Sequence, residues 1–385
     1  MSQLSHRLDG FGESVIRKMT RIANKYGAIN LSQGFPDFDP PQVLIEELQR
    51  VAIEGPHQYA VTWGAQNFRE ALAKKQEHFM GIKLDPNENI VVTCGSTEAM
   101  MTAMMAVCDS GDKVAVFSPF YENYVADTVL CGAEPIYIPL KPPTFNFDKE
   151  ELEAAFKAGA KALILCNPSN PTGKVFTKEE LLVIADLVKE YDAYVITDEV
   201  YEHIVFEPSK HHYVAALPDM FERTISCSSL SKTYSITGWR LGYVIAPKNV
   251  IDQCKKVHDF LTVGAAAPLQ EAATVGLQLG EDYYKELTEL YAKKRELFLS
   301  GLDSIGLKYF KPEGAYYVMV DISEFGFNSD YEFAKRLIRE IGVAGVPGSS
   351  FFKEPVNQYI RFHFAKKPET LELALDKLKE IRKHF

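Results

Sequence analysis

Hydrophobic residues in the first part of the chain recur mainly at helical spacing. In residues 15–26 the apolar side chains fall at i, i+3, i+4 and i+7, which predicts an amphipathic helix. A loop dense in turn-forming residues follows at 31–41. Two more amphipathic helices are predicted at 42–53 and from residue 68 to about residue 80.

The hydrophobic pattern changes at residue 89, where short apolar runs begin to alternate with helical segments. The predicted strands are Ile90–Cys94, Lys113–Phe117, Glu134–Pro139, Ala162–Cys166, Tyr194–Asp198, Thr224–Ser228 and Leu241–Ala246. Thr177 and Glu180 have the spacing of a capping box, which predicts that a helix starts there. Strands that alternate with helices favour a mainly parallel sheet with helices on both faces. We therefore expect an α/β fold with a seven-stranded sheet.

The chain after residue 280 has a different pattern. A long charged helix is predicted at 281–302, followed by a strand at 314–321, a helix at 331–341, a strand at 359–364 and a closing helix. This order favours a smaller α+β unit. We expect a large domain at 42–280 and a small domain formed by 1–41 together with 281–385.

The composition is that of an ordinary globular protein, since 46% of the 385 residues are hydrophobic and 24% are charged. The formal net charge of −10 argues against a surface for nucleic acid. No uncharged apolar run approaches the roughly 18 residues of a membrane span, and the polar N-terminus lacks the apolar core of a signal peptide. We expect a cytoplasmic protein that binds neither nucleic acid nor membrane.

The cysteines and histidines do not form a metal-binding pattern. None of the six cysteines belongs to a C-x-x-C pair, and the nine histidines give no H-E-x-x-H. Several cysteines lie beside Val, Ile and Leu, which is typical of buried thiols. We expect no metal site and no disulfide framework.

Candidate chemistry centres on residues 229–242, Ser-Leu-Ser-Lys-Thr-Tyr-Ser-Ile-Thr-Gly-Trp-Arg-Leu-Gly, directly after a predicted strand. Ligands of open α/β sheets bind at the carboxyl ends of the strands. The amine of Lys232 can form a Schiff base with a carbonyl where its surroundings favour the neutral form, and Ser229 and Arg240 could hold an anion. A lysine exposed in a polar loop is the alternative. The segment also contains the S-x-x-K of penicillin-binding proteins, but their S-D-N and K-T-G tripeptides do not occur.

The same segment resembles the active-site lysine signature of the class I/II aminotransferases, which have the fold-type-I architecture and use pyridoxal 5′-phosphate (PLP). The resemblance extends from about residue 30 to residue 366. It is closest to the kynurenine, glutamine, methionine and aspartate aminotransferase-like group. It implies that Lys232 holds the PLP aldehyde as a Schiff base and moves the proton of the substrate Cα as general base and acid.

Two further motifs resemble cofactor-binding positions of the family. In T-D-E-V-Y, Asp198 matches an aspartate that pairs with the pyridinium nitrogen, and Tyr201 matches a tyrosine that bonds the phenolic oxygen. In N-P-S-N-P-T-G, Asn170 matches an asparagine that bonds the same oxygen. Apart from the resemblance, Asp198 could equally be a helix cap, and the second motif a rigid loop.

Other positions match the family's contacts to the phosphate and the ring. Ser96 and Thr97 lie between a predicted strand and a helix, where backbone N–H groups bind phosphate well. Ser229 and Arg240, which could hold an anion, are also expected to bind the cofactor. Tyr121 matches the aromatic residue that stacks on the cofactor ring.

The resemblance also implies substrate contacts and a dimer. Arg361 matches an arginine that binds the substrate α-carboxylate, Gly34 a glycine whose backbone approaches the substrate, and Asn170 belongs to the same subsite. An exposed arginine on an edge strand is the alternative for Arg361. Tyr59 matches a tyrosine that reaches the phosphate of the neighbouring subunit, which implies a homodimer with shared active sites.

The implied function is transfer of the amino group of an aromatic, methionine, glutamine or aspartate-type L-amino acid to a 2-oxo acid such as 2-oxoglutarate. A PLP-dependent cysteine-conjugate C–S β-lyase stays open as the alternative, because the same motifs support both reactions. A regulator on this scaffold would carry an N-terminal DNA-binding module, for which the residues before Ser32 are too few. No second basic residue for a distal substrate carboxylate is identified. The apolar and small stretch 258–268 predicts a pocket for uncharged or aromatic side chains.

Overall fold

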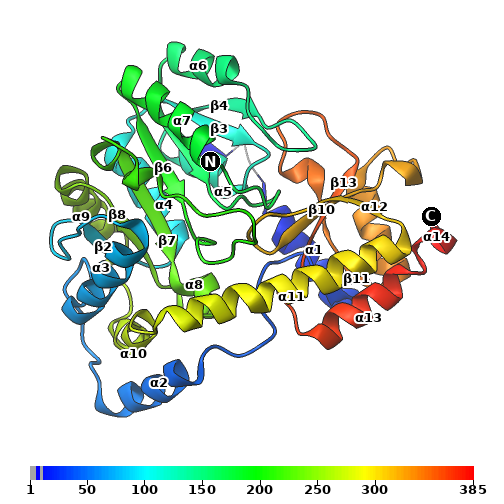
Figure 1. Cartoon of the computed structure of the whole chain (residues 1–385), viewed down its shortest axis with the longest axis horizontal. Coiled ribbons are helices and arrows are strands. Elements are labelled where there is room, and N and C mark those ends of the chain that lie inside the picture. The colour runs from blue at the N-terminus through cyan, green and yellow to red at the C-terminus, as the bar shows by residue number, and fades with distance from the viewer. Residues whose placement is uncertain (1–5, 9–11) are drawn as a thin grey trace, which may run out of the picture.

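A computed structural model describes residues 6–8 and 12–385. Figure 1 shows a central sheet flanked by helices and, beside it, a smaller group of strands and helices. The smaller group contains the N-terminal helix α1 (Val15–Tyr26) and the C-terminal helix α14 (Ile381–His384). The long helix α11 (Glu281–Ile305) runs from the first part to the second.

The central sheet has seven strands in the order β2-β8-β7-β6-β5-β3-β4. Their bounds are β2 (Ile90–Thr93), β3 (Lys113–Ser118), β4 (Glu134–Pro139), β5 (Ala160–Cys166), β6 (Tyr194–Asp198), β7 (Thr224–Ser229) and β8 (Gly242–Ile245). β8 runs antiparallel to both of its neighbours, and all other adjacent pairs are parallel. The predicted mainly parallel seven-stranded sheet is therefore confirmed.

Helices cover both faces of this sheet. They include α2 (Gln42–Glu54), α3 (Gln66–Met80), α4 (Ser96–Val107), α5 (Asn123–Leu130), α6 (Lys149–Lys157), α7 (Lys178–Glu190), α9 (Lys248–Thr262) and α10 (Ala267–Leu277). Val114 and Val116 of β3 join a core cluster with α4 and α9, whereas Ala115 and Phe117 join another with α6 and α7. This alternation follows from the side-chain period of two in a strand, and it explains why the central strands are apolar throughout. The predicted capping box opens α7 at Thr177.

The second part is built on an antiparallel sheet in the order β12-β13-β10-β9. Its strands are β9 (Lys308–Phe310), β10 (Tyr317–Asp321), β12 (Val346–Pro347) and β13 (Tyr359–His363), with helices α12 (Asp330–Arg336) and α13 (Pro368–Leu378) alongside. Near the N-terminus, β1 (Ile29–Asn30) pairs with β11 (Val343–Ala344). The helix predicted at 331–341 consists of α12 and a π-helical turn, Leu337–Ile341.

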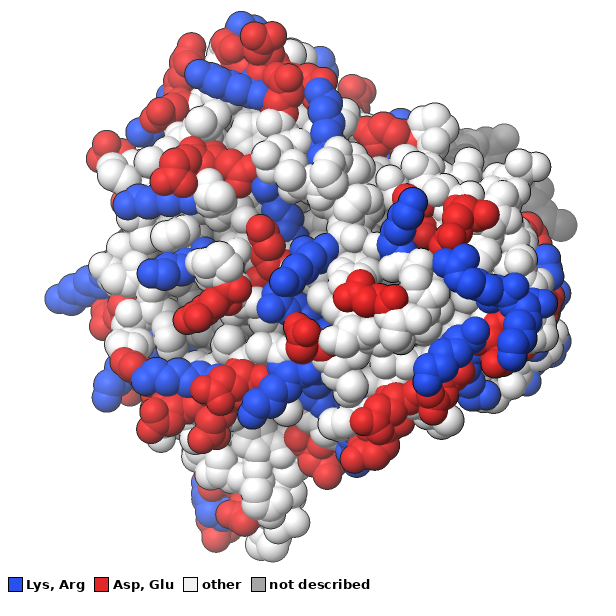
Figure 2. Space-filling model, turned by 45° about the vertical axis from the view of Figure 1, so that its right-hand side comes forward, with Lys and Arg blue, Asp and Glu red and all other residues white. Residues whose placement is uncertain are grey.

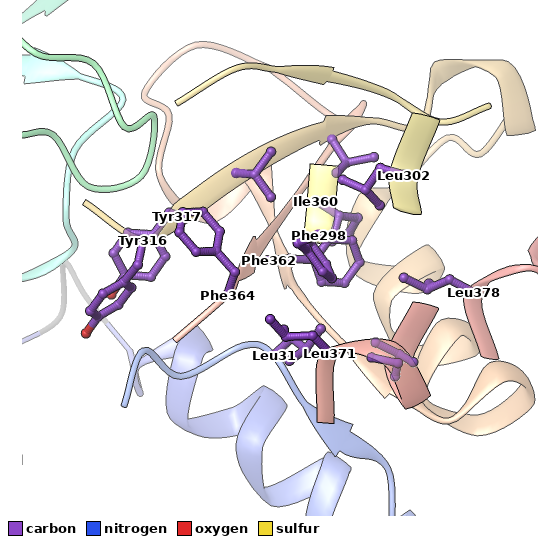
Figure 3. Close-up of a cluster of buried hydrophobic side chains, with 14 of the residues drawn as sticks. Leu31, Phe298, Leu302, Tyr316, Tyr317, Ile360, Phe362, Phe364, Leu371 and Leu378 are labelled. Carbon is purple, nitrogen blue, oxygen red and sulfur yellow. The ribbon is translucent and has the colours of Figure 1, made fainter. Parts of the chain in front are cut away.

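One hydrophobic cluster fills the core of the second part. Figure 3 shows Phe298 and Leu302 of α11 against Ile360 and Phe362 of β13. The same cluster includes the adjacent residues Tyr316 and Tyr317, at the start of β10. The core thus extends toward the carboxyl ends of the central strands.

Charges of both signs are interspersed over the face shown in Figure 2. Arg50, for example, contacts both Glu47 and Glu54 on α2. In residues 6–8 and 12–385, no helix has the length and apolar character needed to cross a membrane. Within the same ranges, no group of three or more His, Cys, Asp or Glu side chains could hold a metal ion.

Candidate active site

A cavity of about 700 Å³ lies where β6 and β7 end and is also lined by residues of β10 and β13. It brings together these residues predicted from the sequence: Gly34, Ser96, Thr97, Tyr121, Asn170, Asp198, Tyr201, Ser229, Lys232, Arg240 and Arg361. Ligands bind open α/β sheets at this edge, because the loops after the strands diverge there.

Lys232 lies on α8 (Leu230–Thr233), a short helix that starts where β7 ends. Its Nζ donates a hydrogen bond to the carbonyl oxygen of Gly34, 3.1 Å away. Burial lowers the pKa of Lys232 to about 8; the Asp198 carboxylate opposes this change, and the charges of Arg240 and Arg361 add to it. Much more of this amine is neutral and nucleophilic near neutral pH than of an exposed lysine.

Asp198 is the last residue of β6 and is buried. Burial raises the pKa of its carboxyl, and three contacts oppose the rise: the Tyr124 hydroxyl donates at 2.7 Å, the Val200 backbone N–H donates at 3.3 Å, and Lys232 lies nearby. Tyr124 was missed in the sequence analysis. The available signal was its position three residues after Tyr121, whose ring it meets edge-on.

The start of α4 and the loop around Arg240 form a cradle for an anion. Ser96 and Thr97 occupy the first turn of α4, where backbone N–H groups have no partner within the helix. Gly95 has φ of 81°, and a Cβ there would lie 2.3 Å from Nη2 of Arg240. The glycine thus lets the guanidinium reach the helix start. Ser229 caps α8, and its Oγ accepts from a backbone N–H 3.4 Å away.

Arg361 of β13 is fully buried in the cavity wall. Its Nη1 donates to Oδ1 of Asn170 at 2.6 Å, and its Nη2 donates to the carbonyl oxygen of Ser32 at 2.8 Å. Its Nε has no hydrogen-bond partner among the described residues. The guanidinium stacks over the ring of Tyr317, 4.2 Å from the ring centroid. Arg361 is therefore held rigidly and is not an exposed edge-strand residue.

Two tyrosines beside Gly34 were also missed. The Tyr316 hydroxyl donates to the carbonyl oxygen of Gly34 at 2.8 Å, so this oxygen is shared with Lys232. The hydroxyls of Tyr317 and Tyr201 are 2.9 Å apart. A Cβ at Gly34 would lie 2.2 Å from the Tyr317 hydroxyl oxygen, so only glycine fits this close approach. In the sequence, Tyr316 and Tyr317 could have been noticed only as a pair of tyrosines near the start of a predicted strand.

Two sequence-based predictions fall outside the cavity of this chain. Tyr59 does not line it and is 87% exposed. The stretch 258–268 does not line it either, because α9 extends to Thr262 and lies against the loop that carries Tyr59. Together these segments form an exposed apolar patch of Tyr59, Val61, Phe260, Leu261 and Val263.

Comparison with known proteins decides the family. The family described as "Aminotransferase class I and II" matches residues 26–378. The chain belongs to this family. It is an aminotransferase that depends on PLP, as the members of the class are.

Similar proteins cover nearly the whole chain. The methionine aminotransferase of Escherichia coli (strain K12) is 36% identical over 97% of this chain and 97% of its own. The kynurenine–oxoglutarate transaminase 3 of Bos taurus is 35% identical over 97% of this chain and 89% of its own. An Escherichia coli crystal structure with a reported methionine aminotransferase function superposes with a TM-score of 0.95, at 36% identity, over 99% of this chain and 100% of its own. These names support amino-group transfer and lend no support to the C–S β-lyase alternative.

The cavity of this aminotransferase fits PLP on its own chemistry. A buried lysine whose pKa is lowered suits an aldehyde. A buried carboxylate suits a pyridinium nitrogen, and the cradle of α4 and Arg240 suits a phosphate. The three features lie in one cavity, so a single ligand can engage them together.

Proposed function

We propose that the cavity residues divide into a group that holds PLP and a group that holds the substrate. Lys232 would hold PLP covalently, Asp198 would pair with its ring nitrogen, and Tyr201 and Asn170 would bond its phenolic oxygen. Ser96, Thr97, Ser229 and Arg240 would bind the phosphate, and Tyr121 would stack on the ring. The observation that carries the proposal is the buried lysine of lowered pKa in the same cavity as the buried Asp198.

In this proposal the protein's own residues position the substrate and transfer one proton. When bound, PLP supplies an aldehyde and a ring that accepts the electron pair left at Cα. Arg361 binds the substrate α-carboxylate, since its planar fork matches two oxygens, and Asn170 keeps it oriented. Once a substrate amine has displaced it, the neutral Nζ of Lys232 would take the proton from the substrate Cα and pass it to the carbon of the former PLP aldehyde. The Gly34 carbonyl, 3.1 Å from Nζ, holds this amine in place between the two transfers.

We also propose the substrate pair. The donor is an L-amino acid of the methionine or aromatic type, and the acceptor is 2-oxoglutarate. The names of the E. coli methionine aminotransferase and the bovine kynurenine–oxoglutarate transaminase support this pair. Glutamine and aspartate-type donors stay predictions from the sequence.

The active enzyme is a homodimer in this proposal. The exposed apolar patch around Tyr59 and Phe260 supports it, since such a patch is typical of an interface. A small domain of 1–41 with 281–385, beside a large domain of 42–280, is supported by the pairing of β1 with β11. The cytoplasmic location stays a prediction.

The proposed role of Lys232 is tested with the Lys232→Ala variant. We expect transamination between methionine and 2-oxoglutarate to fall by about 10³-fold or more, because both the covalent hold and the Cα proton transfer are lost. Addition of L-methionine should convert the visible absorption band of the wild-type holoenzyme but leave the variant unchanged. Lys178→Ala, at an exposed helix start, is the matched control. Wild-type-like turnover in Lys232→Ala would refute the assignment.

A further inference from the structure

The first turn of α1 forms part of the cavity wall and carries a basic side chain that the roles above leave unused. Ser14, Val15, Ile16 and Arg17 all line the cavity. Among the described residues, no carboxylate lies within ion-pair distance of the Arg17 guanidinium, and only its backbone N–H has a recorded hydrogen bond. Its charge is therefore free to meet a ligand.

The other basic side chains of this region are already engaged. Arg21 contacts Glu13, with Nη2 2.7 Å from Oε2. Lys18 points elsewhere, since its Nζ lies 5.0 Å from the ring centroid of Tyr331. Arg361 is bonded to Asn170 and to the Ser32 carbonyl. Arg17 thus differs from these neighbours, because it is an exposed residue that lines the cavity and has no charged partner there within the described part of the chain.

The carboxylates beside Arg17 are also supplied with donors. Glu122 accepts from the Ser14 hydroxyl and, at 3.3 Å, from the Val15 backbone N–H. Glu13 is paired with Arg21. Neither carboxylate approaches Arg17 closely enough to neutralise it, so an anionic group of a ligand would find a charge that is not yet paired.

Arg17, Arg361 and Tyr121 all line the same cavity. The pKa of Tyr121 is raised above all by burial, and the charge of Arg17 acts against that rise. Tyr121 in turn counteracts the lowering of the Arg361 pKa by burial. Both guanidinium groups thus act electrostatically on Tyr121 and line one cavity.

We propose that Arg17 binds the distal carboxylate of dicarboxylic substrates, 2-oxo acids and amino acids of the 2-oxoglutarate and glutamate class, while Arg361 binds the α-carboxylate. The assignment rests on the proposed function for the identity of the α-carboxylate site. A planar guanidinium suits a carboxylate because two parallel N–H donors match its two oxygens. With a neutral substrate Arg17 stays solvated, so one cavity serves a dicarboxylic acceptor and an uncharged donor in turn.

The first experiment measures binding without turnover. Glutarate and pentanoate differ by one carboxylate, and their dissociation constants are measured by calorimetry on the holoenzyme. In Arg17→Gln we expect glutarate to bind about 10- to 100-fold more weakly, the usual loss for a hydrogen bond to a charged group, while pentanoate changes less than about threefold. Arg17→Lys should lie between the two, since it keeps the charge and loses the fork.

The second experiment measures specificity. With methionine as donor, kcat/KM for 2-oxoglutarate divided by kcat/KM for phenylpyruvate should fall about 10- to 100-fold in Arg17→Gln, mainly through KM for 2-oxoglutarate. Lys18→Gln, which removes the neighbouring charge from the same helix, should leave the ratio at the wild-type value. An equal loss for both acceptors, or no loss, would overturn the proposal. If no donor is converted but glutarate binding still falls in Arg17→Gln, the proposed function fails and the Arg17 assignment stands.

Discussion

Burial and charge oppose each other at Lys232 and Asp198. Burial disfavours the charged form of both, so it lowers the pKa of Lys232 and raises that of Asp198, while each charge stabilises the other. The positive charges of Arg240 and Arg361 also lower the pKa of Lys232. The cofactor-free cavity therefore holds a lysine that titrates well below the ordinary range.

We expect this titration to appear in chemical labelling of the cofactor-free protein. Acetic anhydride reacts with the neutral amine, so the labelling rate of Lys232 should rise with pH and reach half its maximum near pH 8. An ordinary lysine, with a pKa of about 10.4, would still be accelerating at that pH. Mass spectrometry of digested samples gives the rate for Lys232, and exposed Lys83 serves as the internal reference. A midpoint close to pH 10 would contradict the effect of burial.

The sequence predicted many of the residues that line the cavity but not all of their neighbours. Asp198, Asn170 and Lys232 belong to contiguous motifs, so they can be recognised from the sequence alone. Tyr124 and Arg17 are not part of such motifs. Tyr124 reaches Asp198, and Arg17 lines the cavity, because of how α5 and α1 pack in three dimensions, which periodicity does not specify.

A buried pair of side chains, Glu98 and His258, joins the start of α4 to α9. Oε1 of Glu98 lies 2.6 Å from Nδ1 of His258, and its Oε2 accepts from the Cys94 backbone N–H at 2.5 Å. Nε2 of His258 lies 3.0 Å from the carbonyl oxygen of Thr62, in the loop that carries Tyr59. Burial alone would raise the pKa of Glu98, but the contacts with His258 and the Cys94 backbone N–H hold it below its usual value. The pair thus fixes the proposed phosphate cradle relative to the Tyr59 loop.

Replacing His258 by Asn should weaken cofactor binding. The variant loses the contacts to Glu98 and Thr62, so the α4 start and the Tyr59 loop are no longer held together, and we expect the PLP dissociation constant to rise about tenfold. Equilibrium dialysis of the cofactor-free protein measures it. Lys256→Gln, on the exposed face of α9, is the control and should match the wild type. Unchanged affinity in His258→Asn would show that the pair does not position the cradle.

The accuracy of the predicted elements followed their length and environment. All strands of the central sheet were predicted within about two residues. Most of them are buried along nearly their whole length and form continuous apolar runs, whereas the edge strand β4 is mostly half-buried. The strands β1, β11 and β12 have two residues each, which is too short for any periodicity. β10 starts at Tyr317 and not at Gly314, since Ala315 has a left-handed φ of 56°, which interrupts the extended backbone.

The exposed apolar patch lies on the surface of the molecule outside the cavity, and it carries Tyr59. Phe260 is 91% exposed and Val263 is 51% exposed, which is unusual for side chains of this size in a monomer. Gly264 lies against Thr62, so both segments of the patch form one surface. A second copy of the chain would cover it and bring the partner's Tyr59 toward the proposed phosphate site.

We expect the double substitution Phe260→Glu and Leu261→Glu to shift the proposed homodimer toward monomer. Two charges in the interface should raise the dimer dissociation constant by at least about 100-fold, and cofactor affinity should fall with it. Size-exclusion chromatography with light scattering measures the state. Leu373→Glu, at a 53% exposed leucine on α13, is the matched control. A double variant that stays dimeric would place the interface elsewhere.

The continuity of the second core with the cavity has a consequence for engineering this enzyme. Phe298 and Leu302 belong to the same packed cluster as Tyr316 and Tyr317, which contact Gly34 beside Lys232 (Figure 3). Close-packed interiors transmit small displacements, so a repacking chosen for heat tolerance also displaces the wall of the proposed substrate site. Directed evolution at those core positions would therefore change thermal tolerance and substrate range together. The exposed Arg17 lies outside that cluster, and a library there can vary the substrate range while the melting temperature stays constant.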